Sequence, residues 1–356
     1  MPSLFSPLRL GALSVPNRIF MAPLTRCRAG ASHLANALMA EYYAQRASAG
    51  LLIAEATMTM EGHSAFWTEP GIYSPAHAAG WRLVTDAVHA AGGRIFLQLW
   101  HGGRACHPLL NNGAQPVGAS ALAITGDEVH TPAGKQPYVV PHVLRDEELP
   151  GIVAGFRRAA EYAQHAGFDG VEVHGANGYL LDQFLRDGSN RRDGPYGGPL
   201  EHRARLLLEV LAAVCEVWSG DRVGLRLSPL NSYNDMRDSD PVGLATWLAQ
   251  RLNDYGLAYL HLMRGDFFGQ QQGDVLTPVR AGYRGVLVGN MGYTPDEAEH
   301  AIASGQLDAV AFGTAFLANP DLPARIKAHA PLNAPDPATF YTPGPAGYTD
   351  YPIWPG

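Results

Sequence analysis

Eight short apolar segments, separated by amphipathic segments of helical length, constrain the fold of this chain more than any other feature. The expected strands are 18–23, 51–57, 94–100, 170–174, 222–227, 258–263, 285–289 and 309–313. Each is nearly continuous in Val, Ile, Leu, Phe or Ala, which is typical of parallel strands buried on both faces. Strands of this kind alternating with helices predict an α/β fold, a single (β/α)8 TIM barrel.

The segments between the strands have the pattern of helices. The expected helices are 37–49, 78–91, 147–166, 200–218, 241–255, 295–304 and 320–328, with a weaker pattern over 264–284. Two helix starts combine a capping residue with proline at the first helical position, namely Thr294-Pro295 and Asn319-Pro320. We therefore expect helices to begin beside these two capping residues.

Three segments depart from this repeat. Residues 10–17 have the pattern of a short hairpin closing the bottom of the barrel. Residues 101–146, after the third strand, show no helical period, and a connection this long is usually a lid or subdomain. The tail, 331–356, is rich in Pro, Gly and Tyr and is expected to lie over the barrel without regular structure. No linker interrupts the chain, so residues 1–356 are expected to form one domain.

Composition narrows the function. A net charge of -7 and a pI near 6.0 favour neither nucleic acid nor an anionic membrane as a partner. The cysteines Cys27, Cys106 and Cys215 are widely separated, which fits a reducing compartment better than a disulfide framework. The N-terminus lacks the pattern of a signal peptide, and the sequence contains no run of about 18 apolar residues that could span a membrane. We expect a cytoplasmic protein.

Active sites of such barrels lie at the carboxyl ends of the strands. Here these ends carry Thr25, Gln98 and Arg226, whose donors, acceptors and positive charge suit a flat heterocycle. Asn290 and Thr314, with neighbouring glycines, follow strands seven and eight, where barrels commonly bind phosphate on backbone amides. Together these residues predict a mononucleotide-like cofactor.

The fourth strand ends in a separate group of polar side chains. His174, Asn177 and Tyr179 follow it within six residues, interrupted by Gly175 and Gly178. A strand that ends in an imidazole, an amide and a phenol predicts the floor of a ligand pocket.

Seven motifs, in this order, resemble those of the old yellow enzyme family of FMN-dependent ene-reductases. The matching segments are 4–11 (LFSPLRLG), 17–26 (NRIFMAPLTR), 98–104 (QLWHGGR), 174–184 (HGANGYLLDQF), 189–190 (SN) with 196–198 (YGG), 225–229 (LRLSP) and 309–313 (AVAFG). The resemblance extends over nearly the whole chain and implies a (β/α)8 barrel that acts as an NADPH dehydrogenase, a monomer or homodimer.

The resemblance also implies roles for individual residues. Non-covalent FMN, reduced by NAD(P)H, would be held by Pro23, Thr25, Ala56, Gln98, Arg226, Asn290, Gly313 and Thr314. His174 and Asn177 would bind and polarise the oxygen of an electron-poor alkene such as an enone, enal, maleimide or nitroalkene. Tyr179 would protonate the α-carbon while the β-carbon receives hydride. The apolar pocket walls would be Phe66, Trp100 and Tyr341.

One departure from the family pattern affects the cofactor. After Phe312-Gly313 the family usually has an arginine that reaches the FMN phosphate, whereas this chain has Thr314. A hydroxyl and backbone amides can bind phosphate without a charge, so we expect weaker FMN retention than in relatives.

Other departures affect the pocket. Residues 62–70, with Phe66 and Trp67, lack the tyrosine often found at this wall, which predicts a more apolar pocket. Cys27 lies two residues after Thr25, away from the position where some relatives carry a redox-tuning cysteine, and is expected to be a buried small residue.

Other classes of protein fit the sequence less well. A Schiff-base aldolase needs a strand-end lysine, and the only lysines are Lys135 and Lys327. Dienoyl reductases with an iron–sulfur cluster need more cysteines, and no GxGxxG motif indicates a separate dinucleotide domain. His101 and His107 lack further ligands, so no metal is expected. A phenol-binding flavoprotein or redox sensor without alkene turnover stays open.

Overall fold

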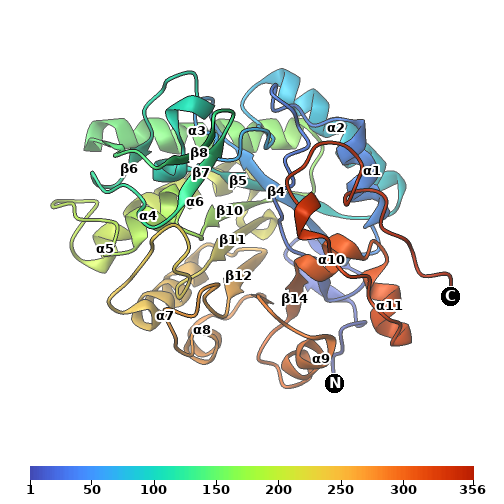
Figure 1. Cartoon of the computed structure of the whole chain (residues 1–356). Coiled ribbons are helices and arrows are strands. Elements are labelled where there is room, and N and C mark those ends of the chain that lie inside the picture. The colour runs from blue at the N-terminus through green and yellow to red at the C-terminus, as the bar shows by residue number, and fades with distance from the viewer.

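The computed structural model describes residues 1–356 and has at its centre a closed barrel of eight parallel strands (Figure 1). In chain order they are β3 (Ile19–Met21), β4 (Leu51–Met58), β5 (Ile95–Trp100), β10 (Gly170–Gly175), β11 (Val223–Leu227), β12 (Tyr259–Met263), β13 (Leu287–Asn290) and β14 (Ala309–Phe312). Every residue in these strands is buried, which explains their continuous apolar character. The predicted barrel and its eight strands are confirmed.

Helices surround the barrel (Figure 1). Those that match the expected segments are α1 (Ala37–Gln45), α2 (Pro75–Ala90), α3 (Leu149–His165), α5 (Leu200–Arg203) with α6 (Arg205–Trp218), α7 (Pro241–Arg251), α9 (Pro295–Ala303) and α11 (Leu322–Ala328). The weak pattern over 264–284 contains α8 (Leu276–Gly282). Two short helices at strand ends were not predicted, α4 (Leu180–Leu185) and α10 (Thr314–Ala318).

One of the two predicted helix caps is correct. Thr294 accepts from the backbone N–H of Glu297, and the Glu297 side chain accepts from that of Thr294, which forms a capping box at the start of α9. The prediction for Asn319 was wrong, because α11 begins only at Leu322. Asn319 instead accepts from the backbone N–H of Asn333 at 2.7 Å and so ties the end of α10 to the tail.

The predicted N-terminal hairpin is present as β1 (Leu8–Leu10) and β2 (Leu13–Val15), which pair antiparallel. Its apolar side chains join a hydrophobic cluster that includes Phe20 and Phe96 from the barrel strands. The adjoining turn bonds to the backbone just before β11, since the Ala12 N–H donates to the Asp221 carbonyl at 3.0 Å. The hairpin therefore closes the amino-terminal end of the barrel, away from the site.

The segment 101–146 contains more regular structure than its sequence indicated. It carries a hairpin of β7 (Glu128–Thr131) and β8 (Gly134–Pro137), and a short parallel pair of β6 (Val117–Gly118) with β9 (His142–Val143). Only alternate residues of β7 are buried. Such a strand has one face toward the protein and one toward solvent.

Buried arginines fasten the tail, 331–356, to the barrel. Arg26 donates to the carbonyls of Phe340 at 3.1 Å and Gly347 at 2.7 Å, and Arg46 donates to that of Tyr348 at 3.3 Å. The Tyr348 ring is fully buried and stacks on Tyr42, with ring centroids 3.9 Å apart. The tail has only one short 3-10 helix, in agreement with its composition. No helix in the protein has both the length and the apolar character needed to cross a membrane.

Candidate active site

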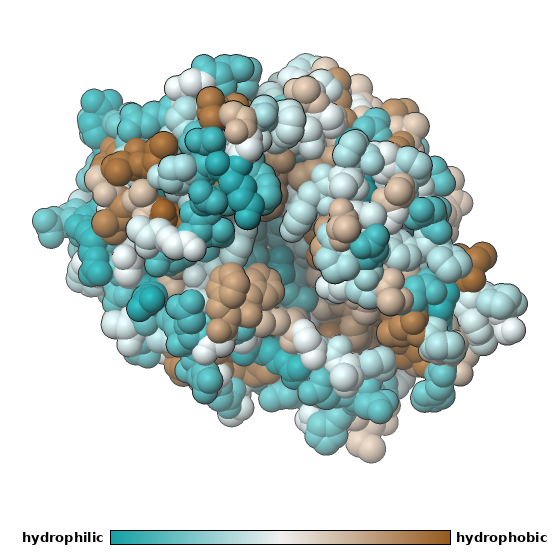
Figure 2. Space-filling view, viewed as in Figure 1, coloured by the Kyte–Doolittle hydropathy of each residue, from teal (hydrophilic) through white to brown (hydrophobic).

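A pocket of about 520 Å³ opens among the loop after β4, the β7–β8 hairpin and the tail. The face on which β7 and β8 lie is hollowed near its centre (Figure 2). Phe66, Tyr179 and Tyr341 line the pocket. The rings of Phe66 and Tyr341 stack with centroids 5.9 Å apart, although more than half of Tyr341 is exposed. Tyr341 is thus both a pocket wall and a surface residue.

His174 is the next-to-last residue of β10 and pairs with Arg226 of β11. Burial, and then the charges of Arg226 and His261, hold the pKa of His174 well below its usual range. The imidazole is therefore neutral at neutral pH, with one N–H to donate. Its Nδ1 is buried and has no hydrogen-bond partner in the protein.

Asn177 follows in a tight left-handed turn with φ of +58°. Asparagine tolerates this conformation better than most residues do. Its backbone N–H donates to Ser228 Oγ at 2.7 Å, and its carbonyl accepts from Asn234 Nδ2 at 2.9 Å. Its side-chain Oδ1 accepts from Asn231 Nδ2 at 2.9 Å, which leaves Nδ2 of Asn177 without a protein partner.

Tyr179 precedes α4 and is almost entirely buried. Its ring centroid lies 5.4 Å from that of His174 and 5.1 Å, edge-on, from that of Trp100. Burial, and then the neighbouring Tyr233 and Tyr138, raise the pKa of Tyr179 well above its usual value. The phenol therefore stays protonated at neutral pH. Trp100, which was predicted as a pocket wall, does not line the pocket; it is fully buried and packs edge-on against Tyr179.

Beneath these groups lies a buried layer that the sequence analysis missed in part. Gln98 Nε2 donates to Glu172 at 2.7 Å, and His261 Nδ1 lies 2.8 Å from the other carboxylate oxygen. Although burial opposes it, His261 and Arg226 hold the pKa of Glu172 below its usual value. Glu172 lies two residues before His174, so strand periodicity places both on the same face and could have revealed it.

Arg226 and Asn290 belong to the same buried layer. Arg226 Nη2 donates to Asn290 Oδ1 at 2.7 Å, and Asn290 Nδ2 donates to the Ala311 carbonyl at 2.7 Å. Arg226 Nε is buried without a partner. An unpaired buried guanidinium N–H is costly, so this atom marks a place for an acceptor group.

A second cavity, of about 310 Å³, adjoins this layer at the ends of β13 and β14. Five predicted cofactor residues line it, namely Pro23, Arg226, Asn290, Gly313 and Thr314. A Cβ placed on Gly313 would meet a single protein atom, Leu24 Cδ2, at an ordinary contact distance of 3.5 Å. Bare backbone beside a cavity is what phosphate binding by amides requires.

The other three predicted cofactor residues do not line this second cavity. Gln98 lies in the buried layer, Ala56 is buried in β4, and Thr25 is half-buried with a hydroxyl that bonds to no protein group. A phosphate cradle, an unpaired buried guanidinium and a free hydroxyl together fit FMN, whose ring and phosphate need these partners. The residues present therefore suit the cofactor.

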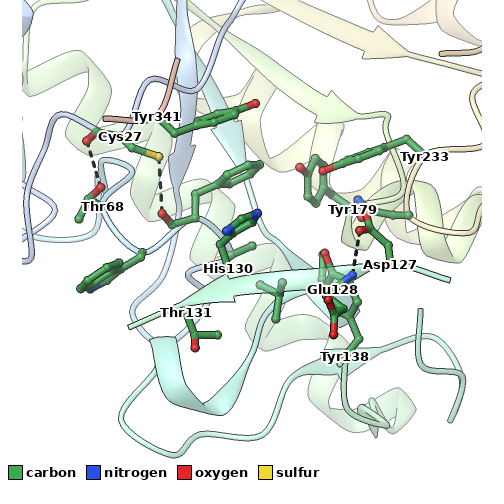
Figure 3. A pocket seen from close by; sticks show the side chains of 16 residues that line it. Cys27, Thr68, Asp127, Glu128, His130, Thr131, Tyr138, Tyr179, Tyr233 and Tyr341 are labelled. Atoms are coloured by element: carbon green, nitrogen blue, oxygen red, sulfur yellow. Dashed lines mark hydrogen bonds between the residues drawn. The ribbon is translucent and has the colours of Figure 1, made fainter. Parts of the chain in front are cut away.

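Residues of the β7–β8 hairpin and the loop before it also line the pocket; they lie within the segment 101–146 that the sequence indicates as a lid or subdomain, although no motif singles them out. Figure 3 shows Glu128 and His130 across the pocket from Cys27 and Tyr341. Cys27 is buried, as expected, and burial raises the pKa of its thiol. It is therefore a thiol at neutral pH and has no thiolate reactivity.

His101 and His107 make packing and capping contacts within the protein. The His101 ring lies against that of His63, with centroids 3.7 Å apart and planes inclined by 34°, and burial, followed by His63, lowers the pKa of His101. His107 caps a short 3-10 helix through the Leu109 N–H. No three His, Cys, Asp or Glu side chains anywhere in the chain are grouped so that they could hold a metal ion.

A (β/α)8 barrel with a phosphate cradle, a buried guanidinium and neutral donors above it defines a class of flavin-dependent oxidoreductases. In agreement, residues 3–333 match the model of the "NADH:flavin oxidoreductase / NADH oxidase family". This chain belongs to that family, which is the family of the old yellow enzymes.

Relatives are similar over almost the full chain. A "Probable flavin mononucleotide-dependent alkene reductase" of Leishmania infantum is 51% identical over 98% of this chain and 97% of that protein. The "12-oxophytodienoate reductase 1" of Oryza sativa subsp. japonica is 42% identical over 98% of this chain and 93% of that protein.

Two solved structures show the same fold. The old yellow enzyme from Trypanosoma cruzi has a TM-score of 0.96 and 46% identity, covering 99% of both chains. A morphinone reductase in complex with tetrahydroNAD has a TM-score of 0.95 and 46% identity, covering 99% of this chain and 98% of that one.

Proposed function

We propose that this chain is an ene-reductase that uses NAD(P)H and non-covalently bound FMN to reduce small electron-poor alkenes. The observation that carries the proposal is the grouping of His174, Asn177 and Tyr179 beside the buried layer of Arg226. The names of the alkene reductase and the oxophytodienoate reductase support the same reaction class.

His174 and Asn177 bind the substrate oxygen. A neutral imidazole N–H and an amide N–H both donate to a carbonyl or nitro oxygen, and polarising that oxygen makes the β-carbon electron-poor. Neither donor is positively charged, so neither would lose its proton to a bound phenolate. The pair would therefore also bind that anion by hydrogen bonds. Enones, enals, maleimides and nitroalkenes all offer such an oxygen.

Tyr179 supplies the proton. Its raised pKa keeps the phenol protonated, and its ring lines the pocket with its centroid 5.4 Å from that of His174. After hydride has reached the β-carbon, the α-carbon takes the phenolic proton, which solvent replaces. Whether the hydride and the proton reach the same face or opposite faces of the alkene determines the stereochemistry of the product.

The predicted cofactor residues fall into groups according to the part of FMN that each would contact. Thr25 and Gln98 would bond the ring edge, Arg226 would stabilise negative charge on the ring, and Gly313 with Thr314 would hold the phosphate. FMN held by these residues would supply the hydride transfer from NAD(P)H to the alkene. Donor and alkene would use one pocket in turn, so we expect ping-pong kinetics.

The test is a visible spectrum of the purified holoenzyme under argon. Oxidised flavin bands should bleach with NADPH and return on addition of 2-cyclohexenone. A protein that lacks flavin would refute the proposal. Bleaching without return, together with a phenol charge-transfer band, would favour the alternative of a phenol-binding flavoprotein without alkene turnover.

A further inference from the structure

Asn231 lies in the turn after β11 and is fully buried. It is not among the site residues predicted from the sequence. Its Oδ1 accepts from the backbone N–H of Phe267 at 3.2 Å and from that of Tyr233 at 3.4 Å. Its Nδ2 donates to Asn177 Oδ1 at 2.9 Å. Both the oxygen and the nitrogen of the side-chain amide therefore have partners within the protein.

These bonds determine which way the Asn231 amide faces. A backbone N–H can only donate, so the atom that faces Phe267 and Tyr233 must be oxygen. The opposite atom, which faces Asn177, must then be nitrogen. A nitrogen there can only donate, so Asn177 must present its Oδ1 to Asn231 and keep its own N–H groups for another partner.

This constraint matters because an amide is nearly symmetric in shape but not in hydrogen bonding. Rotated by half a turn, Asn177 would fill the same space and present oxygen, an acceptor, to the ligand. Facing the oxygen of an enone or a phenolate, that acceptor would repel instead of bind. The backbone of Asn177 is already held by Ser228 and Asn234, so the side-chain amide is the part left to be oriented.

We propose that Asn231 is a positioning residue that fixes the Asn177 amide as a hydrogen-bond donor to the ligand oxygen. The inference rests on the proposed role of Asn177 in oxygen binding. Asn231 acts through Asn177 and has no contact of its own with substrate or cofactor. The backbone N–H groups of Phe267 and Tyr233 orient the Asn231 amide, and the Asn231 amide in turn orients that of Asn177.

The direct test is Asn231→Asp, which keeps the shape of the side chain. An ionised carboxylate still accepts from Phe267 and Tyr233 but cannot donate to Asn177 Oδ1. Asn177 should therefore turn its N–H toward the carboxylate and its oxygen toward the ligand. Binding of a phenol to the holoenzyme, followed by the charge-transfer band and by calorimetry, should weaken about tenfold or more. Asn177→Ala removes the donor without adding an acceptor, so its loss should be no larger.

Protonation gives a readout that a purely structural defect would not show. As pH falls and the introduced carboxyl group takes up a proton, it gains an O–H that can donate to Asn177 Oδ1. The ratio of variant to wild-type phenol affinity should then rise toward one at low pH. The same ratio for Asn177→Ala should stay constant with pH.

A double variant completes the test. In the Asn177→Ala background, Asn231→Asp should cause no further loss of phenol affinity, because the amide that it reorients is absent. Equal losses in both backgrounds, or wild-type affinity for Asn231→Asp alone, would overturn the proposal. If Asn231→Asp does not fold, Asn231→Ala should give a smaller loss that also vanishes in the Asn177→Ala background. Phenol binding is measured apart from turnover, so an enzyme that binds phenol without reducing alkenes would refute the proposed function and leave Asn231 testable.

Discussion

Replacing Thr314 by arginine should tighten the binding of FMN. Thr314 lines the cavity beside Gly313 and is exposed at the start of α10. A hydrogen bond to a charged group contributes about 1.5–3 kcal/mol, which corresponds to a roughly 10- to 100-fold change in the dissociation constant. Because the position is exposed, solvent screens the interaction and the lower end applies. We expect tightening of about tenfold.

The assay is the recovery of flavin fluorescence after dilution of the holoenzyme into buffers of low and high salt. The Debye length falls from about 10 Å at 0.1 M salt to about 3 Å at 1 M, so the gain from Thr314→Arg should shrink at high salt. Thr314→Gln is the matched control, since it adds length and donors without charge. Unchanged affinity, a gain that salt does not diminish, or an equal gain from Thr314→Gln would refute the reasoning.

Three further outcomes follow from the site and its surroundings. Tyr179→Phe should leave flavin reduction by NADPH nearly intact and slow alkene reduction by about 10²- to 10⁴-fold in stopped-flow measurements, and equal damage to both half-reactions would contradict the proton-donor role. His174→Ala should raise the KM for cyclohexenone and weaken phenol binding, with flavin content unchanged, and an unaltered phenol affinity would remove His174 from oxygen binding. Burial lowers the pKa of His63 to about 4, so the unfolded chain takes up more protons than the folded one between about pH 6.5 and 4. As the pH is lowered through that window, the free energy of unfolding should fall by up to about 1.4 kcal/mol per pH unit. Urea titrations should find a smaller slope in His63→Phe.

The barrel could be predicted because its strands are buried on both faces and therefore carry continuous apolar runs. The β7–β8 hairpin could not, because Glu128 to Pro137 is polar and only alternate positions of β7 are buried. A hairpin that lies on the protein surface needs few apolar residues, so composition gives no signal for it.

The site residues show the same division. His174 and Arg226 stand at strand ends, where the fold class itself directs attention. Asn231 acts through the backbone N–H of Phe267, in a loop after the next strand, so its role depends on a contact that no local pattern encodes. Asn319 had the local pattern of a cap, yet a tertiary contact with Asn333 determines its role.

The arginine contacts of the tail have a consequence for altering the pocket. Arg26, Arg28 and Arg46 bind carbonyl oxygens of the tail, which every amino acid possesses. Tyr341 lies between the anchored positions Phe340 and Gly347 and lines the pocket, whereas no tail contact of these arginines is with its own carbonyl. Attachment and lining are thus separate properties of one segment. Position 341 could be varied to reshape the substrate range while the backbone that carries it stays in place.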